Sequence, residues 1–417
     1  MMTVDSRLRK IPHMHWITII ALFFALASIW GSTVNTASLF ITPIQETLQA
    51  TRPQMVMGTT VKGLGNILGA FICAFLLKRM PVMQVIRLAA LLLTGSVFAM
   101  SYVNSLLQYY LAIIFQTSMT SIGAYVPMSI VIQNWFEKNT SLAIGFAFMG
   151  SGFGGMIYNY LGGLWIPAFG WRRTLFLFGI ITLISLFITL FVIVRATPYH
   201  LNLRPYGAAD DFELTDVTDD LPGVEMKDAL KSIRFWIFIS AIFLVTMTTN
   251  ALFNNLSPHL IDIGYSLPQA AQVSSAFMLF LMIGKPVIGY AFESLGLKAA
   301  SIICTLAIAL GVLSAILAGH KIFLITLVVG AGMGFSFSSI AYPAFSKSLF
   351  GAKNYASFAS FLQISAGAGM LVGPIVTGLL YQYSKSYILN FILALVYSTI
   401  SILIWLFVLP KRGHEPY

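Results

Sequence analysis

The sequence contains few charged residues. Aspartate, glutamate, lysine and arginine together make up 9% of the 417 positions, whereas roughly 25% is usual in globular proteins. Hydrophobic residues make up 58% of the chain, and a water-soluble protein of this size could not shield so much apolar surface. A lipid bilayer is a matching solvent for that surface. The composition therefore argues against an ordinary soluble protein and predicts an integral membrane protein.

Cysteine is almost absent as well. Cys73 and Cys304 each lie deep in an apolar stretch, so no disulfide framework is supported and both are interpreted as packing residues. No cluster of metal ligands, Walker loop or nucleophile triad occurs, so we expect neither a cofactor nor an enzyme. The glycine-dense segment 150–155 lies within an apolar run and does not follow a strand, which argues against a phosphate-binding loop.

The basic residues do not form a stripe. They are scattered between apolar segments, so the net charge of +10 does not indicate a nucleic-acid partner. If the N-terminus is cytoplasmic, 17 of the 24 basic residues fall on the inner side and 5 on the outer side. Cytoplasmic loops of membrane proteins collect Lys and Arg. We therefore predict that both termini are cytoplasmic, in a protein of the plasma (inner) membrane.

Twelve apolar runs are long enough to cross a bilayer, which needs about 20 residues per helix. We place them near 15–40, 54–77, 83–103, 108–134, 141–164, 172–194, 235–258, 270–292, 298–318, 322–345, 355–381 and 386–410. The polar segment 195–234 separates six runs from six and contains a run of acidic residues.

This layout is typical of two related bundles around a central site. We predict an all-α polytopic membrane protein with twelve transmembrane helices in two pseudo-symmetric six-helix bundles. Residues 1–194 would form the first bundle, 195–234 a water-exposed cytoplasmic linker with one amphipathic helix near 226–233, and 235–417 the second bundle.

Two short segments echo each other in the two halves. After the eighth run, Gly289 is followed by Glu293, Gly296 and Lys298. This spacing resembles the loop signature of the major facilitator superfamily. At the matching place in the first half, Gly69 and Lys78 are present, but Cys73 stands where the acid belongs. The resemblance implies the twelve-helix fold of solute carriers, without a conventional charge lock in the first half.

A second set of motifs resembles one branch of that superfamily, the monocarboxylate porters and oxalate:formate antiporters. The chain has Asn134-Trp135-Phe136 before the fifth run, many glycines within it, and Gly170-Trp171-Arg172 before the sixth. The glycines would serve close helix packing, since small residues let backbones approach. These motifs point to a family and do not specify a substrate.

Two lysines fall inside the apolar runs. Lys62 lies in the outer half of the second run and Lys285 precedes Pro286 in the eighth. A buried cation costs a few kcal/mol on insertion scales and normally faces a polar cavity or a partner. In the monocarboxylate branch a substrate-facing cation commonly precedes a proline in the eighth helix, so the resemblance implies that role for Lys285. Alternatively, either lysine reaches a lipid headgroup, or Lys62 pairs with Glu46 or with the end of the first run.

Acidic residues are absent from the interior of every run. Carriers of cations and many proton symporters use membrane-embedded carboxylates, so cations without carboxylates favour an anionic substrate. The resemblance also implies limits: Leu281 stands where some relatives have an acid, and the eleventh run lacks the lysine of oxalate carriers. Oxalate itself is therefore disfavoured.

Uncharged polar residues at membrane depth are further candidates for the cavity lining. With the two lysines, the predicted substrate-binding set comprises Lys285, Lys62, Asn35, Gln116, Tyr125, Asn250, Asn254, Tyr342 and Gln363. For each uncharged residue the alternative is a hydrogen bond between helices.

The preferred function is secondary transport of a small organic anion, such as a monocarboxylate, by proton symport or anion exchange. The expected partners are that anion, protons and the lipid bilayer, with the protein acting as a monomer and no nucleic acid involved. One alternative is a carrier that exports neutral or hydrophobic small molecules. Another is a sensor or enzyme that reuses the fold, which the lack of an added soluble domain disfavours.

Overall fold

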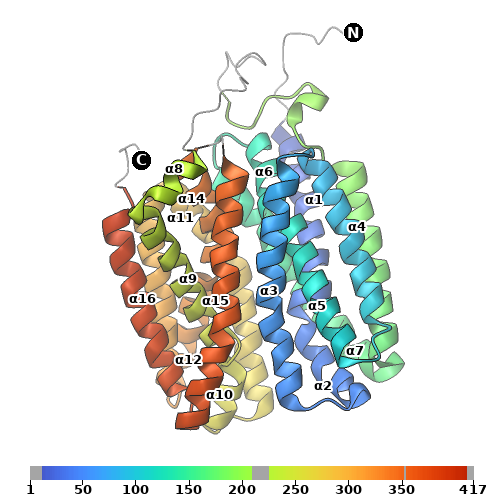
Figure 1. Cartoon of the computed structure of the whole chain (residues 1–417), viewed down its shortest axis with the longest axis vertical. Coiled ribbons are helices and arrows are strands. Elements are labelled where there is room, and N and C mark those ends of the chain that lie inside the picture. The colour runs from blue at the N-terminus through green and yellow to red at the C-terminus, as the bar shows by residue number, and fades with distance from the viewer. Residues whose placement is uncertain (1–11, 209–224, 352–353, 411–417) are drawn as a thin grey trace.

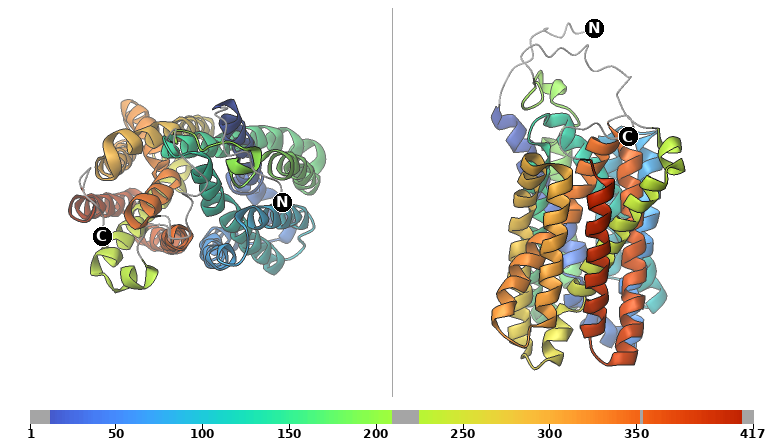
Figure 2. Two further views of the ribbon diagram at one scale, coloured as in Figure 1. Left: turned by 90° about the horizontal axis from the view of Figure 1, so that it is seen from above. Right: turned by 90° about the vertical axis from the view of Figure 1, so that its left-hand side faces the viewer.

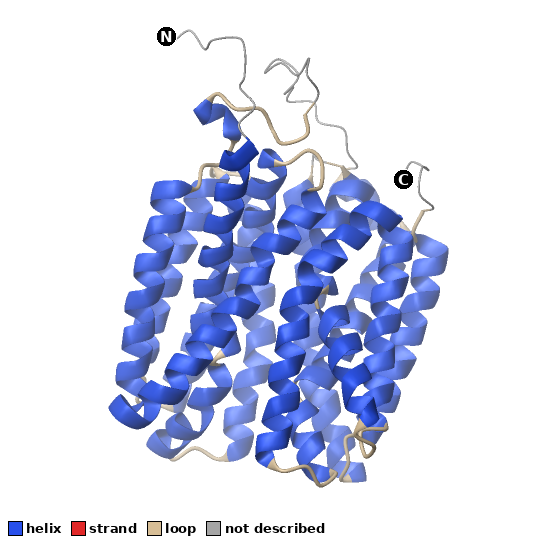
Figure 3. Cartoon of the chain, turned by 180° about the vertical axis from the view of Figure 1, so that it is seen from behind, coloured by secondary structure: helices blue, strands red, loops and turns tan. Residues whose placement is uncertain are grey.

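A computed structural model of the chain describes residues 12–208, 225–351 and 354–410. Long helices run side by side along one axis (Figure 1). In these ranges no strand occurs, and an isolated β-bridge pairs Phe136 with Tyr206. Figure 3 shows the same arrangement of helices and loops from behind.

The helices have the following bounds in chain order. They are α1 (Pro12–Trp30), η1 (Gly31–Asn35), α2 (Ala37–Leu48), α3 (Arg52–Leu77), α4 (Val82–Met100), α5 (Leu106–Thr120), η2 (Ser121–Tyr125), α6 (Val126–Trp135), α7 (Thr140–Leu186), η3 (Phe187–Ile193), η4 (Pro198–Leu201), α8 (Met226–Lys231), α9 (Ile233–Phe253), α10 (Leu256–Asp262), α11 (Leu267–Ile316), α12 (Ile322–Thr326), η6 (Leu327–Ala331), α13 (Gly332–Phe335), α14 (Phe337–Phe350), α15 (Tyr355–Ser384) and α16 (Ile388–Val408). The η4 segment is a 3-10 turn, and the other η segments are π-helical turns within longer helices.

Ten helical stretches in the described ranges are long and apolar enough to span a membrane. Two of them, Thr140–Ile193 and Gln272–Ile316, are each long enough to cross twice. Both reverse direction at a glycine in the left-handed region, Gly170 with φ of 78° and Gly296 with φ of 80°, a conformation that glycine adopts readily because it lacks a Cβ. The described residues thus make twelve crossings, and the predicted all-α membrane fold is confirmed.

The structure changes two of the predicted limits. The first crossing continues from α1 through η1 and α2 to Leu48, beyond the apolar run, because an amphipathic helical end needs no lipid-matched composition. Residues 195–208 pack on the end of the first half, where the Trp135 indole donates to the Arg195 carbonyl at 2.9 Å and Leu203 is 1% exposed. These residues therefore contact the first half, while the acidic run from Asp210 to Asp220 lies outside the described residues, and the linker 195–234 stays a prediction.

The crossings group by half. In Figure 1, α1 to α7 lie on one side and α9 to α16 on the other, with α3 next to α15. The view from above in Figure 2 shows the same two groups. The α7 helix packs against α11, so these two pairs of helices join the halves. The exact limits 1–194 and 235–417 stay a prediction.

One end of the molecule holds the start of α1 and the end of α16, at the top of Figure 1. We call it the terminal end and the opposite one the distal end. Odd-numbered crossings run from the terminal to the distal end and even-numbered crossings return. The depth of a residue is its distance along its helix from one of these two ends.

Glycines in the first part of α7 allow it to lie directly on α1. A Cβ built on Gly154 would overlap the carbonyl oxygen of Ala27, and one on Gly150 would overlap that of Phe23. Both obstacles are backbone atoms of a helix and cannot rotate away. The glycine-rich sequence of this helix is therefore explained by close packing against its neighbour.

We predict that Gly154→Ala destabilises the protein, whereas Gly163→Ala does not. Overpacking of this kind costs about 1–3 kcal/mol, and no atom lies within 4 Å of a Cβ at Gly163. The monodisperse fraction that survives heating in detergent measures the effect. Equal survival of the two variants would contradict the packing argument.

Candidate functional site

The Lys285 side chain lies at the crossing of α7 and α11, between the two halves. It is 4% exposed. Its ammonium nitrogen donates to the carbonyl oxygen of Phe148 at 2.9 Å and to the hydroxyl of Ser151 at very short range. Both acceptors belong to α7, so a cation of the second half is held by the first half.

Two glycines of α7 make this crossing possible. A Cβ on Gly145 would lie 2.6 Å from the Lys285 carbonyl oxygen, and one on Gly152 would lie 2.8 Å from the Met282 Cβ. They are seven residues apart and thus two turns apart on one face. The helices therefore meet with almost no side chain between them, and the lysine fills the remaining space.

The electrostatics of this position are unusual. Both partners of the Lys285 ammonium are neutral, and no acidic residue in the described ranges forms an ion pair with it. A buried charge without a counter-charge is costly, because neutral dipoles replace only part of its hydration. An anion bound beside Lys285 would lower the free-energy cost of this buried charge.

Aromatic residues surround the same level of the molecule. The Tyr125 ring stacks on Phe148 with a centroid distance of 5.7 Å and meets Trp30 edge-on at 5.1 Å. The Tyr125 hydroxyl approaches Ser339 and Tyr342 of α14. The Trp30 indole nitrogen is buried and has no hydrogen-bond partner among the described residues. The cluster thus offers flat apolar faces and one unused donor.

Two further predicted residues lie within this region. The Asn35 amide nitrogen donates to the Ser151 carbonyl oxygen at 2.7 Å, which ties the π-helical turn η1 to the residue that holds Lys285. The Tyr342 hydroxyl lies 3.3 Å from that of Thr246, which joins α14 to α9. Asn35 is therefore linked to the lysine through Ser151 and Tyr125 through Phe148, while Tyr342 lies one contact further out, beside Tyr125.

A separate hydrogen bond joins the halves at Gln363. Its side-chain oxygen accepts a hydrogen bond from the Ser121 hydroxyl at 3.0 Å, and both residues are buried. Gln363 in α15 therefore serves the contact between helices in this conformation, which is the alternative that the sequence left open.

Lys62 lies in a different environment. Around the axis of α3, with 100° per residue, Lys62 lies between two faces of the helix. Gly58 and Gly65 form the face toward α5, and Asn66, whose amide contacts Met370, forms the face toward α15. It is half-buried, and within the described ranges its ammonium has neither a hydrogen bond nor an ion pair. The suggested pairing with Glu46 is wrong for this conformation.

The two lysines lie at different depths. At 1.5 Å per residue, Lys62 is about 15 Å along α3 from the distal end and Lys285 about 27 Å along α11 from the same end. The other predicted residues do not join the Lys285 cluster: Gln116 lies on α5, and the Asn254 amide donates to the Asn250 side chain at 3.2 Å in the distal part of the seventh crossing. The predicted set thus splits into a mid-depth group and a distal group.

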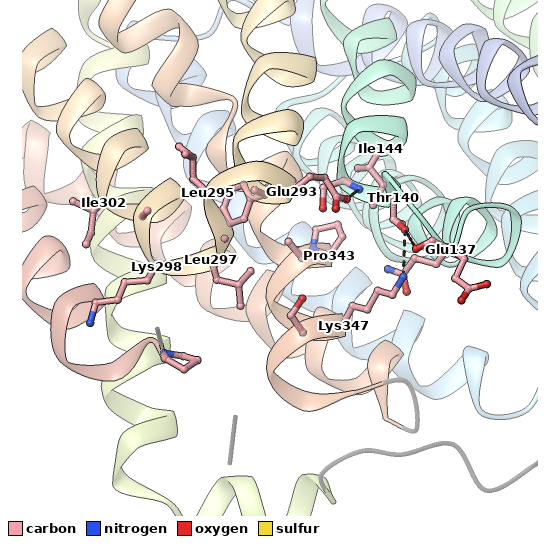
Figure 4. A pocket seen from close by; sticks show the side chains of 18 residues that line it. Glu137, Thr140, Ile144, Glu293, Leu295, Leu297, Lys298, Ile302, Pro343 and Lys347 are labelled. Atoms are coloured by element: carbon pink, nitrogen blue, oxygen red, sulfur yellow. Dashed lines mark hydrogen bonds between the residues drawn. The ribbon is translucent and has the colours of Figure 1, made fainter. Parts of the chain in front are cut away.

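The terminal end of the junction carries a network of charges (Figure 4). The Glu293 carboxylate accepts a hydrogen bond of 2.6 Å from the Ser141 backbone N–H, and Lys347 donates to the Thr140 hydroxyl at 3.2 Å. The Ser141 N–H and the Thr140 hydroxyl both lie in the first turn of α7. The helix dipole favours a carboxylate such as that of Glu293 at this N-terminus. Glu293 therefore links the loop signature of the second half to the first half.

A cavity of about 630 Å³ opens beside this network. Glu137, Glu293, Lys298 and Lys347 are its charged lining residues, and Ile144 and Phe292 lie among the apolar ones. In the first half, Cys73 is 0% exposed and its sulfur lies 3.7 Å from the Ile122 carbonyl oxygen. The position that lacks an acid is thus buried in a helix contact.

Sequence reasoning missed Ser151, Phe148 and Trp30. Phe148 acts through its backbone carbonyl, which no residue pattern reveals, and Trp30 is one of 7 tryptophans. Ser151 offered a faint signal, since it is a hydroxyl residue within the glycine run and lies next to Gly152. Its role depends on which helix crosses α7 there, and the run alone does not specify that helix.

We predict that Glu293→Gln loosens the terminal end. The amide is neutral, so the attraction between the Glu293 charge and the N-terminus of α7 is lost. Such an interaction is worth typically 0.3–1 kcal/mol and up to ~2 kcal/mol. Maleimide should label a cysteine placed at Ile144 about three- to ten-fold faster in this variant. Glu46→Gln, a change at an exposed distal acid, is the control, and an unchanged rate in Glu293→Gln would argue against the contact.

Comparison with known proteins supports the fold at the level of a superfamily. The family model described as the Major Facilitator Superfamily matches residues 18–274 and 238–417. Among solved structures, a proton:xylose symporter of that superfamily superposes with a TM-score of 0.73 and 15% identity, covering 96% of this chain and 97% of that chain. At this identity the similarity shows the fold alone.

Curated relatives match at higher sequence identity but over smaller shares of the chain. A riboflavin transporter of Trypanosoma cruzi is 28% identical over 144 residues, 34% of this chain and 30% of that protein. The benzoate transport protein of Acinetobacter baylyi is 23% identical over 327 residues, 71% of this chain and 68% of that protein. The chain thus spans about a third of the length of the first of these relatives.

Proposed function

The chain belongs to the Major Facilitator Superfamily, and we propose that it carries a small organic anion, preferably a monocarboxylate, across the membrane by alternating access. It is a multi-pass membrane transporter and not an enzyme. The observation that carries the proposal is Lys285, a mid-depth cation that is 4% exposed and held by neutral acceptors only. A carboxylate would supply the missing counter-charge.

The surroundings of Lys285 suit a flat carboxylate. Trp30 and Tyr125 offer aromatic faces, and the free indole N–H of Trp30 can donate to an oxygen. Benzoate combines a carboxylate with such a ring, and one relative is named for its transport. These features also support placement in the monocarboxylate porter and oxalate:formate antiporter branch, which we propose as the subfamily.

Lys62 supplies a second positive charge nearer the distal end. Its unpaired ammonium would attract an anion electrostatically before or after the anion occupies the Lys285 level. We therefore propose Lys62 and Lys285 as the charged members of the route, with Asn35, Tyr125 and Tyr342 around the inner position. Gln116, Asn250, Asn254 and Gln363 are proposed as polar lining on either side of it.

The orientation completes the proposal. We propose that both termini are cytoplasmic and that the membrane is the plasma (inner) membrane, which the excess of basic residues at the terminal end supports by the positive-inside rule. No acid of the described crossings is buried and able to act as a proton relay, so we propose either symport with a proton that travels on the anion or anion exchange.

We predict that Lys285→Gln lowers benzoate uptake by purified protein in liposomes at least ten-fold. The amide keeps donors for Phe148 and Ser151 but loses the charge, and hydrogen bonds to charged groups are worth about 1.5–3 kcal/mol. Lys285→Arg should retain part of the uptake. Lys321→Gln, at an exposed distal lysine, is the matched control; full uptake by Lys285→Gln would contradict the proposal.

Lys62→Gln should have a smaller effect that depends on salt. Lys62 is half-buried, and its attraction for an anion that is still in solution is screened over about 8–10 Å at physiological ionic strength. We expect a two- to five-fold rise in the benzoate concentration for half-maximal uptake at low salt, and a smaller rise at high salt. An effect of equal size at both salt concentrations would argue against electrostatic attraction.

A second candidate is a carrier of neutral aromatic compounds, favoured by the Trp30–Tyr125–Phe148 cluster. A riboflavin transporter among the relatives gives this candidate a probe. It predicts riboflavin uptake that survives Lys285→Gln. Benzoate uptake that requires Lys285, with no uptake of riboflavin, would exclude it.

A further inference from the structure

The hydrogen bonds of Lys285 cross from one half of the molecule to the other at mid-depth. We propose that this ammonium is a tether that keeps the halves closed toward the terminal end, and that the transported anion releases it by competing with Phe148 and Ser151. The tether stands on the structure alone, and its release by the anion rests on the proposed function.

The position of the contact supports a closing role. The α7–α11 contacts continue from Met282 and Lys285 to Gly289, which lies against Ser141, and to Glu293 at the terminal end. Lys285 is thus the side-chain link of this crossing at mid-depth, and Glu293 the one at its terminal end. Opening the terminal end requires both links to part.

The two acceptors are arranged for one ammonium. Phe148 and Ser151 are three residues apart and so share a face of α7. The Asn35 amide holds the Ser151 carbonyl at 2.7 Å, so the acceptor residue is fixed from the neighbouring helix α1–η1. An ammonium has three donors, and two are used here. The third is available to an incoming oxygen.

Release of the tether leaves no unsatisfied group in the first half. The Phe148 carbonyl lies inside a helix, where a backbone N–H serves it, and a serine hydroxyl can turn to the carbonyl four residues earlier. Ser118 and Thr94 make this type of bond at 2.8 Å in the same protein. A carboxylate forms a stronger, charge-assisted bond with the ammonium than either neutral acceptor does. The anion can therefore displace both acceptors.

Ser151 is consequently a positioning residue that acts through Lys285. Its hydroxyl stabilises the closed arrangement and competes with the substrate. Removing the hydroxyl weakens closure while leaving the cation in place. This separates Ser151 from residues that simply support folding, whose loss would not change which end of the protein is open.

The test measures opening directly. A cysteine at Ile144, which is 2% exposed and lines the terminal cavity, reports access from that end, and the two natural cysteines are buried. Ser151→Ala should raise the maleimide labelling rate about ten-fold without substrate, since one hydrogen bond to a charged group is lost. Ser398→Ala is the control, because Ser398 is buried and bonds within its own helix.

The second arm uses benzoate as the probe. Benzoate should accelerate labelling in the Ile144→Cys parent and have little further effect in Ser151→Ala. It should have no effect in Lys285→Gln. The half-maximal benzoate concentration for uptake should fall several-fold in Ser151→Ala, because the competing acceptor is gone.

The outcomes separate the two proposals. An unchanged labelling rate in Ser151→Ala, with a normally folded protein by size-exclusion, overturns the tether. Faster labelling in Ser151→Ala combined with benzoate that is transported yet does not accelerate labelling overturns release by the anion. Faster labelling combined with no transport of benzoate leaves the tether supported and contradicts the proposed substrate.

Discussion

The junction of the two halves is built around a buried ammonium that has no counter-charge among the residues that the structure describes. Lys285 lies where α7 and α11 cross, and its two neutral acceptors come from the opposite half of the molecule. A protein that only needed stability would replace such a cation with an apolar side chain, because desolvation of a charge is costly. The cation is therefore best explained by an anion that binds there during the cycle.

Glycines of α7 allow the helices around Lys285 to approach closely. Gly145 and Gly152 bring α7 within backbone contact of α11, while Gly150 and Gly154 on another face bring it against α1. The helix thus packs closely against one crossing of each half. Close backbone packing also lets the Phe148 carbonyl reach a side chain from the other half, which longer side chains at these positions would prevent.

Two links hold the halves together along this crossing, and they differ in kind. Glu293 binds the N-terminus of α7 in the terminal cavity, where water and other charges are near. Lys285 binds neutral acceptors at mid-depth, where solvent is excluded. A solute that carries the opposite charge of the cation competes best with the inner link, because its hydrogen bond to the ammonium is stronger than that of a neutral acceptor. This gives the carrier a physical reason to couple opening to occupancy by an anion.

Some of this was determined by the sequence alone. The apolar runs predict twelve crossings because the bilayer requires about 20 apolar residues per helix, and the glycine and loop motifs indicate the superfamily. The two membrane lysines and the lack of acids predict an anionic substrate, because a cation at membrane depth is costly without a counter-charge.

The pairing of helices was decided only by the tertiary structure. Whether Lys285 meets Ser151, or Lys62 meets Glu46, depends on how helices far apart in the chain cross and rotate. Lys62 has no partner among the described residues and Lys285 bonds Phe148 and Ser151, because side-chain partners in a helical bundle are set by contacts between distant segments and not by local spacing.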